Sequence, residues 1–261
     1  MVGMPCSLPV IGDDPNRAGL HQNAIRLRIG LLVCDHVRPE LRSISGDYDD
    51  MFRRLFAGHD EVDVFVYDAI SGELPGAPGE CDAWLTTGSR HSVNDDAPWI
   101  RALEGFVRDV AAARVPFLGI CFGHQLIAKA MGGSVVRSER GWGVGLKEVE
   151  VSPELGLGDS YRVLTSHQDQ VESLPPGAEV LGWNEHCPVS MLRVGSKMVG
   201  IQGHPEFDPD YSMALMELRR GTVIPETIVE EGLASLDQAP DSGRLAEWIM
   251  GMIKSDSGRS V

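Results

Sequence analysis

The sequence predicts a mixed α/β protein whose mostly parallel, twisted sheet is flanked by helices and extended by antiparallel strands. Two observations support this fold class. Between residues 28 and 133, short apolar runs alternate with segments of helical periodicity, which is the pattern of right-handed βαβ crossovers. Between residues 143 and 203, apolar runs follow one another with only turns between them. Such runs leave no room for crossover helices and favour antiparallel pairing.

The parallel half of the sheet is expected to contain four strands, with two helices between them. The apolar runs predict strands at IGLLVCD (29–35), VDVFVYD (62–68), DAWLTTG (82–88) and VPFLGI (115–120). Helical periodicity covers residues 47–58 and 97–113. In the second helix, apolar residues recur every three to four positions, as a core-facing helix requires. These residues are Trp99 or Ile100, Leu103, Phe106 or Val107, and Val110.

The remaining elements are expected to complete one domain over residues 28–254. Antiparallel strands are predicted at residues 143–151, 161–166, 178–183, 189–194 and 197–203, and outer helices at 210–221 and 243–253. The proline-rich and aperiodic residues 1–27 read as an irregular arm, and residues 255–261 as a tail. A chain of 261 residues is long enough to bury the core of one such domain.

The charge of the chain argues against nucleic acid and membranes as partners. Acidic residues outnumber basic ones by 38 to 23, which gives a formal charge of -15, and no run of Lys or Arg could neutralise phosphates. The longest apolar runs are far shorter than the roughly 20 residues that cross a bilayer. Because no secretory signal is evident either, we expect a cytoplasmic protein.

The five cysteines are scattered and form no C-x-x-C pair, which argues against a disulfide framework and against a zinc site. They are Cys6, Cys34, Cys81, Cys121 and Cys187. Free thiols in a reducing compartment are the simplest interpretation. No metal and no cofactor are predicted.

Cys121 stands apart because it lies between two glycines where a predicted strand meets a predicted helix. Gly119-Ile-Cys121-Phe-Gly123 has the G-x-nucleophile-x-G form of a sharp strand-to-helix turn. In so tight a turn, a side chain at either glycine would collide with backbone. A thiolate at a helix N-terminus is favoured by the helix dipole. The backbone N–H of Phe122 is expected to face a developing oxyanion.

A histidine and a carboxylate follow a later predicted strand and complete the expected chemistry. In His204-Pro205-Glu206 the two polar side chains are two residues apart, so in an extended segment they point the same way. Pro205 favours that extended form for its predecessor. A base that is oriented by a carboxylate is what a cysteine nucleophile requires. We therefore predict Cys121, His204 and Glu206 as catalytic residues.

Three segments resemble the class I glutamine amidotransferase family. They are FLGICFGHQLIAKAMGG, TSHQDQVESLPPGAEVLGWNEHCPV and GIQGHPEF, within a similarity that runs from about residue 28 to residue 208. The resemblance implies a flavodoxin-like fold and a Cys-His-Glu triad. It also implies a small-molecule substrate, glutamine or a γ-glutamyl conjugate, whose side-chain amide carbon is attacked by Cys121. His204 would protonate the departing nitrogen, and water would release glutamate from a thioester.

The resemblance also implies the residues that surround the triad. The family's second oxyanion donor comes from a loop that matches TTGSRHS, so the backbone of Gly88 or Ser89 is the candidate here, although the usual double glycine is absent. Gln125 and the segment SHQDQ match substrate-holding regions. They make Gln125, His167 and Asp169 candidates for binding the amino acid head group.

Several features favour a free-standing γ-glutamyl amide or peptide hydrolase. The chain has no G-x-x-x-x-G-K-[ST] loop, so no ATP-binding synthetase is evident. The loop GSRHSVNDDAPWI and the segment RGWGVG (140–145) are similar to stand-alone γ-glutamyl peptidases. Gly203 stands where the family often has phenylalanine, and we expect the missing ring to leave space for a large leaving group. The alternatives are a glutaminase subunit that supplies ammonia to a separate synthetase partner, and a non-catalytic binding module.

Overall fold

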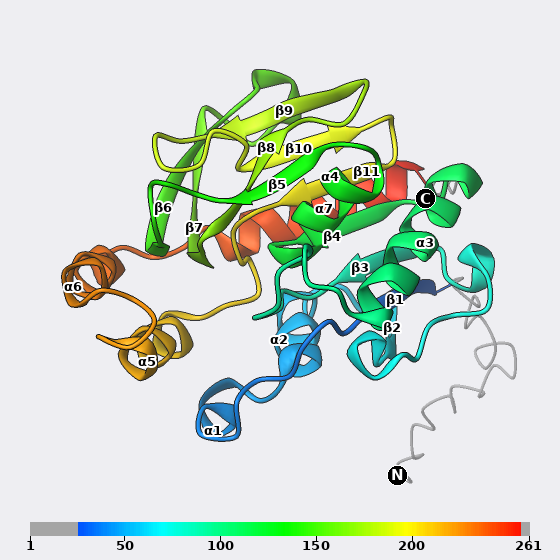
Figure 1. Cartoon of the computed structure of the whole chain (residues 1–261). Coiled ribbons are helices and arrows are strands. Elements are labelled where there is room, and N and C mark those ends of the chain that lie inside the picture. Colours follow the sequence, from blue (N-terminus) through cyan, green and yellow to red (C-terminus); the bar gives the residue numbers. More distant parts are fainter. Residues whose placement is uncertain (1–25, 257–261) are drawn as a thin grey trace, which may run out of the picture.

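A large twisted sheet is the centre of the computed structural model, which describes residues 26–256 (Figure 1). Within that range, nine strands form one sheet in the order β2 (Val62–Tyr67), β1 (Leu27–Leu32), β3 (Ala83–Thr86), β4 (Phe117–Ile120), β11 (Met198–Ile201), β10 (Met191–Val194), β9 (Ala178–Trp183), β6 (Gly143–Val151) and β7 (Ser160–His167). The strands from β2 to β11 pair in parallel. The strands from β11 to β7 pair antiparallel. The predicted fold class is therefore confirmed.

Helices cover both faces of the parallel half. Helices α3 (Pro98–Ala113) and α4 (Phe122–Ala130) pack on one face through an apolar cluster that includes Trp84 of β3. Helices α2 (Tyr48–Leu55) and α7 (Ser242–Asp256) pack on the other face. The apolar stripe predicted for α3 is the buried one; it consists of Ile100, Leu103, Phe106, Val107 and Val110.

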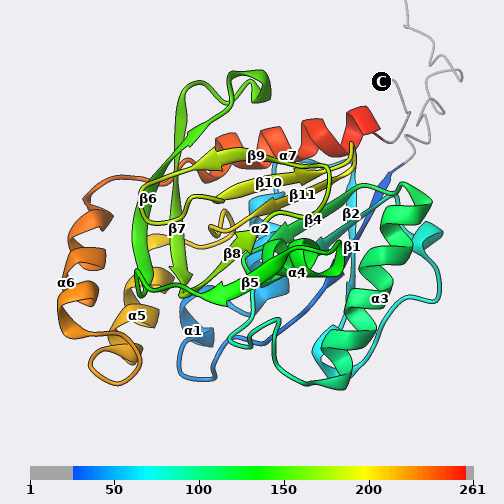
Figure 2. The same ribbon diagram turned by 45° about the horizontal axis from the view of Figure 1, so that its top comes forward.

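Helices α5 (Pro209–Arg219) and α6 (Glu226–Ala234) lie near the ends of β6 and β7 (Figure 2). Helix α1 (Arg42–Ser45) packs beside α5. Tyr211 of α5 and Phe207 share an apolar cluster with Tyr48 of α2 and Leu164 of β7. Short 3₁₀ helices lie in the connections: η2 (Ala69–Ser71), η3 (Pro78–Glu80), η4 (Pro153–Leu155) and η5 (Ser235–Asp237).

Some elements differ from the sequence-based expectation. Strand β1 begins at Leu27, inside the predicted arm, and α7 continues to Asp256. Helices α1 and α6 were not predicted, and neither was a second sheet of β5 (Ser134–Arg137) and β8 (Asp169–Ser173). These strands are short and polar, so they carry little apolar periodicity. The rest of the predicted arm and tail, residues 1–25 and 257–261, lies outside the described residues.

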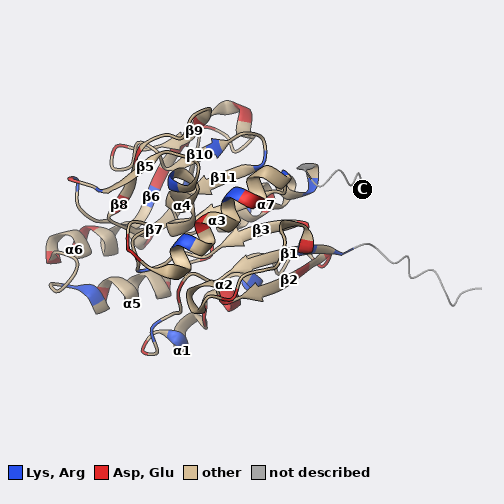
Figure 3. Cartoon of the chain, turned by 45° about the vertical axis from the view of Figure 1, so that its right-hand side comes forward, with Lys and Arg blue, Asp and Glu red and all other residues tan. Residues whose placement is uncertain are grey.

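Basic residues are dispersed over several elements, among them α1, α3 and α5 (Figure 3). This distribution agrees with the absence of a basic run in the sequence. Among the described residues, no helix has the length and apolar character that crossing a membrane requires.

Candidate active site

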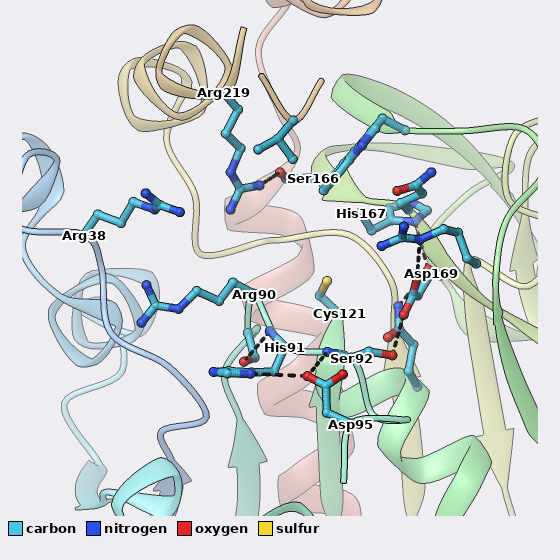
Figure 4. A pocket seen from close by; sticks show the side chains of 16 residues that line it. Arg38, Arg90, His91, Ser92, Asp95, Cys121, Ser166, His167, Asp169 and Arg219 are labelled. Carbon is cyan, nitrogen blue, oxygen red and sulfur yellow. Dashed lines mark hydrogen bonds and ion pairs between the residues drawn. The ribbon is translucent and has the colours of Figure 1, made fainter. Parts of the chain in front are cut away.

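Cys121 lies at the point where β4 turns into α4. The backbone N–H of Cys121 donates to the carbonyl of Ile201 at 2.8 Å, which ties the turn to β11. Cys121 has φ 50° and ψ -96°, a conformation that a residue with a side chain rarely adopts. Strain of this kind costs about 1–3 kcal/mol and clusters at functional sites. The sulfur points into a cavity (Figure 4).

Close packing requires both glycines of the turn, but the predicted collision with backbone occurs only at Gly119, because the neighbour of Gly123 is a side chain. A Cβ atom at Gly119 would collide with the backbone of Gly123 and His124. A Cβ atom at Gly123 would collide with the hydroxyl of Thr86 in β3. The elbow therefore depends on glycine at both positions.

His204 and Glu206 follow β11, the strand next to β4. Nδ1 of His204 lies 2.8 Å from Oε1 of Glu206, and both side chains are buried. The backbone N–H of His204 donates to the carbonyl of Leu164 at 2.7 Å, and the ring of Phe207 stacks on the imidazole with 3.9 Å between centroids. Hydrogen bonding and ring stacking therefore fix the imidazole in one orientation.

The imidazole of His204 lies beside Cys121 and is favoured in its protonated form. Burial acts to lower the pKa of His204, but the charges of Glu206 and Cys121 outweigh burial and raise that pKa to about 10. A Cβ atom at Gly88 would lie 2.6 Å from Cε1 of His204 and 3.6 Å from Cβ of Cys121. Gly88 thus lies close to both side chains, and the structure brings all three predicted catalytic residues together.

Gln202 is a neighbour of Cys121 that the sequence analysis missed. Its Nε2 lies 3.5 Å from the Cys121 sulfur, and its Oε1 lies 3.2 Å from Nε2 of Gln125. The signal was present in GIQGHPEF, because Gln202 stands two residues before His204 and points the same way in an extended segment.

The predicted oxyanion donors have free N–H groups. Among residues 26–256, no protein acceptor takes a hydrogen bond from the backbone N–H of Phe122, Gly88 or Ser89. Ser89 lines the cavity, and Gly88 is buried against Cys121. These positions fit the oxyanion role, which stays a prediction.

The three predicted substrate-binding residues line one side of a cavity of about 400 Å³ beside Cys121. Gln125 donates through Nε2 to the backbone carbonyl of Asp169 at 2.8 Å. The carboxylate of Asp169 accepts from Ser92 at 2.6 Å and lies 3.9 Å from Arg137. Burial lowers the pKa of His167 to about 3, so this imidazole is neutral.

The cavity also contains residues that the sequence analysis did not single out. The predicted loop GSRHSVNDDAPWI contributes Arg90, His91, Ser92 and Asp95, and the segment RGWGVG contributes Trp142. Arg38, Arg219 and Val223 come from elsewhere in the chain. No short motif marks these three, because only the tertiary structure brings them to Cys121.

The expectation for Gly203 was wrong. A Cβ atom at Gly203 would lie 2.5 Å from Cγ1 and 2.8 Å from Cγ2 of Val163 in β7. The space of the missing ring is therefore filled by a core side chain and is not open to a leaving group. The aromatic ring beside His204 comes instead from Phe207.

The other described cysteines are buried free thiols. Burial raises the pKa of Cys187 to about 11 and raises that of Cys34 further. These two residues are thus poor nucleophiles. Over residues 26–256, His, Cys, Asp and Glu side chains form no group of three that could hold a metal ion. Cys6 lies outside the described residues.

A cysteine at a glycine-flanked elbow, with a histidine and a glutamate just after the neighbouring strand, places this α/β protein in the class of glutamine amidotransferase folds. The sequence itself agrees with that class. The model of the family "Glutamine amidotransferase class-I" matches residues 78–217. The chain belongs to this family.

Proteins named for different activities are similar in sequence to this chain. A glutamine amidotransferase-like protein of Schizosaccharomyces pombe is 30% identical over 239 residues, which cover 85% of this chain and 96% of the relative. Gamma-glutamyl peptidase 4 of Arabidopsis thaliana is 29% identical over 205 residues, 74% of this chain and 81% of the peptidase. One subunit of the glutamine-hydrolysing GMP synthase of Thermococcus kodakarensis is 46% identical over 97 residues, 35% of this chain and 51% of that relative.

Solved structures share the fold. The crystal structure of a glutamine amidotransferase from Methylobacillus flagellatus superposes with a TM-score of 0.67 at 24% identity, covering 91% of this chain and 97% of that chain. This likeness extends over both halves of the sheet.

Proposed function

We propose that the protein hydrolyses a γ-glutamyl amide or isopeptide bond through a γ-glutamyl thioester on Cys121. The observation that carries this proposal is the buried His204–Glu206 pair beside a strained cysteine that faces a cavity. The similarity to a gamma-glutamyl peptidase over 74% of the chain supports it. The reacting unit is the single domain that we propose for residues 28–254.

The proposed reaction needs only this chain and water. The Cys121 thiolate attacks the amide carbon, and the backbone N–H groups of Phe122 and of Gly88 or Ser89 stabilise the oxyanion. His204 gives its proton to the departing nitrogen as the carbon–nitrogen bond breaks. Water then adds to the thioester carbon and gives a proton to His204. The sulfur–carbon bond breaks, and glutamate leaves.

Asp169, His167 and Gln125 are proposed to hold the amino acid head group. The Asp169 carboxylate can accept from an α-ammonium group, and the nearby Arg137 can pair with an α-carboxylate. Because the pKa of His167 is about 3, this residue offers a neutral ring that does not repel the ammonium. Gln125 positions the segment through the Asp169 carbonyl.

A second candidate is a glutaminase subunit that supplies ammonia to a synthetase partner. The similarity to a GMP synthase component favours it, but that similarity covers only 35% of this chain. The third alternative, a non-catalytic binding module, does not account for strain at Cys121 or for a triad with all its members present.

A hydrolysis panel tests the proposed function. The purified chain should cleave γ-glutamylglycine without any added protein and leave α-glutamylglycine, its linkage isomer, intact. If glutamine is the one substrate cleaved, and its cleavage requires an added synthetase, the ammonia-supplying role is supported. Cleavage of no substrate would favour the binding module.

A further inference from the structure

The side of the cavity opposite Asp169 carries an excess of positive charge. Arg38, from the segment before α1, and Arg219, at the end of α5, both line the cavity (Figure 4). Arg90 lies near them but forms an ion pair with Asp35 at 2.9 Å. In a chain with a formal charge of -15, two further arginines at one cavity wall are a distinctive local feature.

Arg38 and Arg219 differ from the other cavity arginines because they have no acidic partner within the described part of the chain. Arg90 is paired with Asp35, and Arg137 lies 3.9 Å from Asp169. Arg219 instead donates to the hydroxyl of Ser166 at 3.0 Å, a neutral acceptor. Its charge is therefore not neutralised within the site.

Arg219 is held in place in spite of this missing partner. Its guanidinium carbon lies 5.8 Å from the centre of the Trp142 ring, and the side chain is half-buried. Burial lowers the pKa of Arg219 below its ordinary value, and the positive charge of Arg38 acts in the same direction. An anion bound between the two guanidinium groups would relieve this repulsion.

Arg219 belongs to the helix that packs on the aromatic ring beside His204. The ring of Phe207 stacks on His204, and Tyr211 of α5 packs against Phe207 with 4.7 Å between centroids. The same helix ends at Arg219. With Asp169 proposed to hold the head group, the group attached to the departing nitrogen is left the part of the cavity that Arg38 and Arg219 line.

We propose that Arg38 and Arg219 form a subsite for a carboxylate on the leaving group, so that the preferred substrates are γ-glutamyl amino acids or peptides with a free carboxyl terminus. This proposal rests on the proposed function and narrows its substrate class. Guanidinium groups recognise carboxylates through paired hydrogen bonds. The same two charges would repel the ammonium group of a γ-glutamyl polyamine.

Three substrates of similar size test the subsite through charge alone. They are γ-glutamylglycine, with a leaving-group carboxylate, γ-glutamylglycinamide, its neutral counterpart, and γ-glutamylethylenediamine, which carries an ammonium. For the unaltered protein we expect kcat/KM to fall in that order, by about tenfold or more from the first to the second, which corresponds to about 1.4 kcal/mol. Equal kcat/KM for the first two would overturn the subsite.

Single-residue variants test whether Arg38 and Arg219 cause the preference for a leaving-group carboxylate. The single variants Arg219→Gln and Arg38→Gln should each lower kcat/KM for γ-glutamylglycine about tenfold. Each should change kcat/KM for γ-glutamylglycinamide little. Arg220→Gln is the matched control, because Arg220 is adjacent in sequence but pairs with Glu217 outside the cavity. It should keep the wild-type preference.

The outcomes separate this proposal from the function on which it rests. If Arg38→Gln and Arg219→Gln lower the rates for both substrates equally, or if Arg220→Gln abolishes the preference as well, the subsite is refuted while γ-glutamyl hydrolysis stands. If the unaltered protein cleaves none of the three substrates, both proposals fail. Because the comparison of the three substrates uses the unaltered protein, it tests the subsite even if a variant does not fold.

Discussion

The amide nitrogen of Gln202 lies 3.5 Å from the sulfur of Cys121, and a chain of hydrogen bonds fixes its direction. Nε2 of Gln125 donates to the backbone carbonyl of Asp169 at 2.8 Å and to Oε1 of Gln202 at 3.2 Å. Since Oε1 of Gln202 accepts from Gln125, the other end of that amide must present N–H to the sulfur. Gln202 is therefore a hydrogen-bond donor to the sulfur of Cys121.

Replacing Gln202 by glutamate should therefore slow the chemistry of Cys121. The variant Gln202→Glu exchanges the donor for an acceptor with negative charge. A hydrogen bond to a charged group is worth about 1.5–3 kcal/mol, so we expect alkylation by iodoacetamide at neutral pH to slow about tenfold or more. Gln168→Glu, at a neighbouring cavity residue that does not bond Cys121, is the control. Unchanged alkylation of Gln202→Glu would show that the contact has no influence on the reactivity of Cys121.

Glu206 should control the pH range in which His204 can act as an acid. The charges of Glu206 and Cys121 raise the pKa of His204 to about 10, so the imidazolium persists well above its ordinary limit. In Glu206→Gln the negative charge is lost, and we expect the alkaline limb of kcat/KM to move to lower pH. Turnover should fall by less than in His204→Ala, because the imidazole is still present. An alkaline limb that stays in place would mean that Glu206 has no role in proton transfer.

The His204–Glu206 pair should also make the stability of the folded protein depend on pH. Because the folded-state pKa of His204 is raised above the unfolded value of about 6.5, its contribution to the free energy of unfolding is full below that pH and is lost as pH rises toward 10. Urea titrations of wild type and Glu206→Gln should therefore differ most near pH 6 and converge toward pH 10.

Gly203 should matter for packing and not for substrate choice. Gly203→Ala places a Cβ atom 2.5 Å from Cγ1 of Val163, and overpacking of this kind costs about 1–3 kcal/mol. The double variant Gly203→Ala/Val163→Ala should recover part of the lost unfolding free energy. Gly105→Ala, in an open position on α3, is expected to stabilise by about 0.5–1 kcal/mol. A Gly203→Ala protein of wild-type stability would refute the clash.

The sequence predicts the elbow and the sheet well because both are local patterns. Gly119, Cys121 and Gly123 stand within five consecutive residues, and the steric reason for each glycine can be stated before the fold is known. The strands of the parallel half likewise appear as separate apolar runs. Such features need no knowledge of which segments meet in space.

The features that the sequence does not predict depend on distant contacts. Arg38 and Arg219 are far apart in the sequence and line the same cavity only because the fold brings the segment before α1 and the end of α5 to it. The prediction for Gly203 failed because a side chain at this position would point toward Val163, and the sequence does not reveal that direction. Strands β5 and β8 are too short and too polar to show periodicity.

Trapping of the covalent intermediate is the sharpest test of nucleophilic catalysis by Cys121. Wild type and Cys121→Ala should each be mixed with γ-glutamylglycine that is labelled either in the glutamyl group or in the glycine, then quenched in acid within the first turnover, digested and weighed by mass spectrometry. We expect wild type to carry the glutamyl label, and not the glycine label, on the peptide that contains Cys121. Cys121→Ala should carry neither label, fold normally and lack turnover. Wild-type turnover rates in Cys121→Ala, or a glutamyl label on a residue other than Cys121, would show that Cys121 is not the nucleophile.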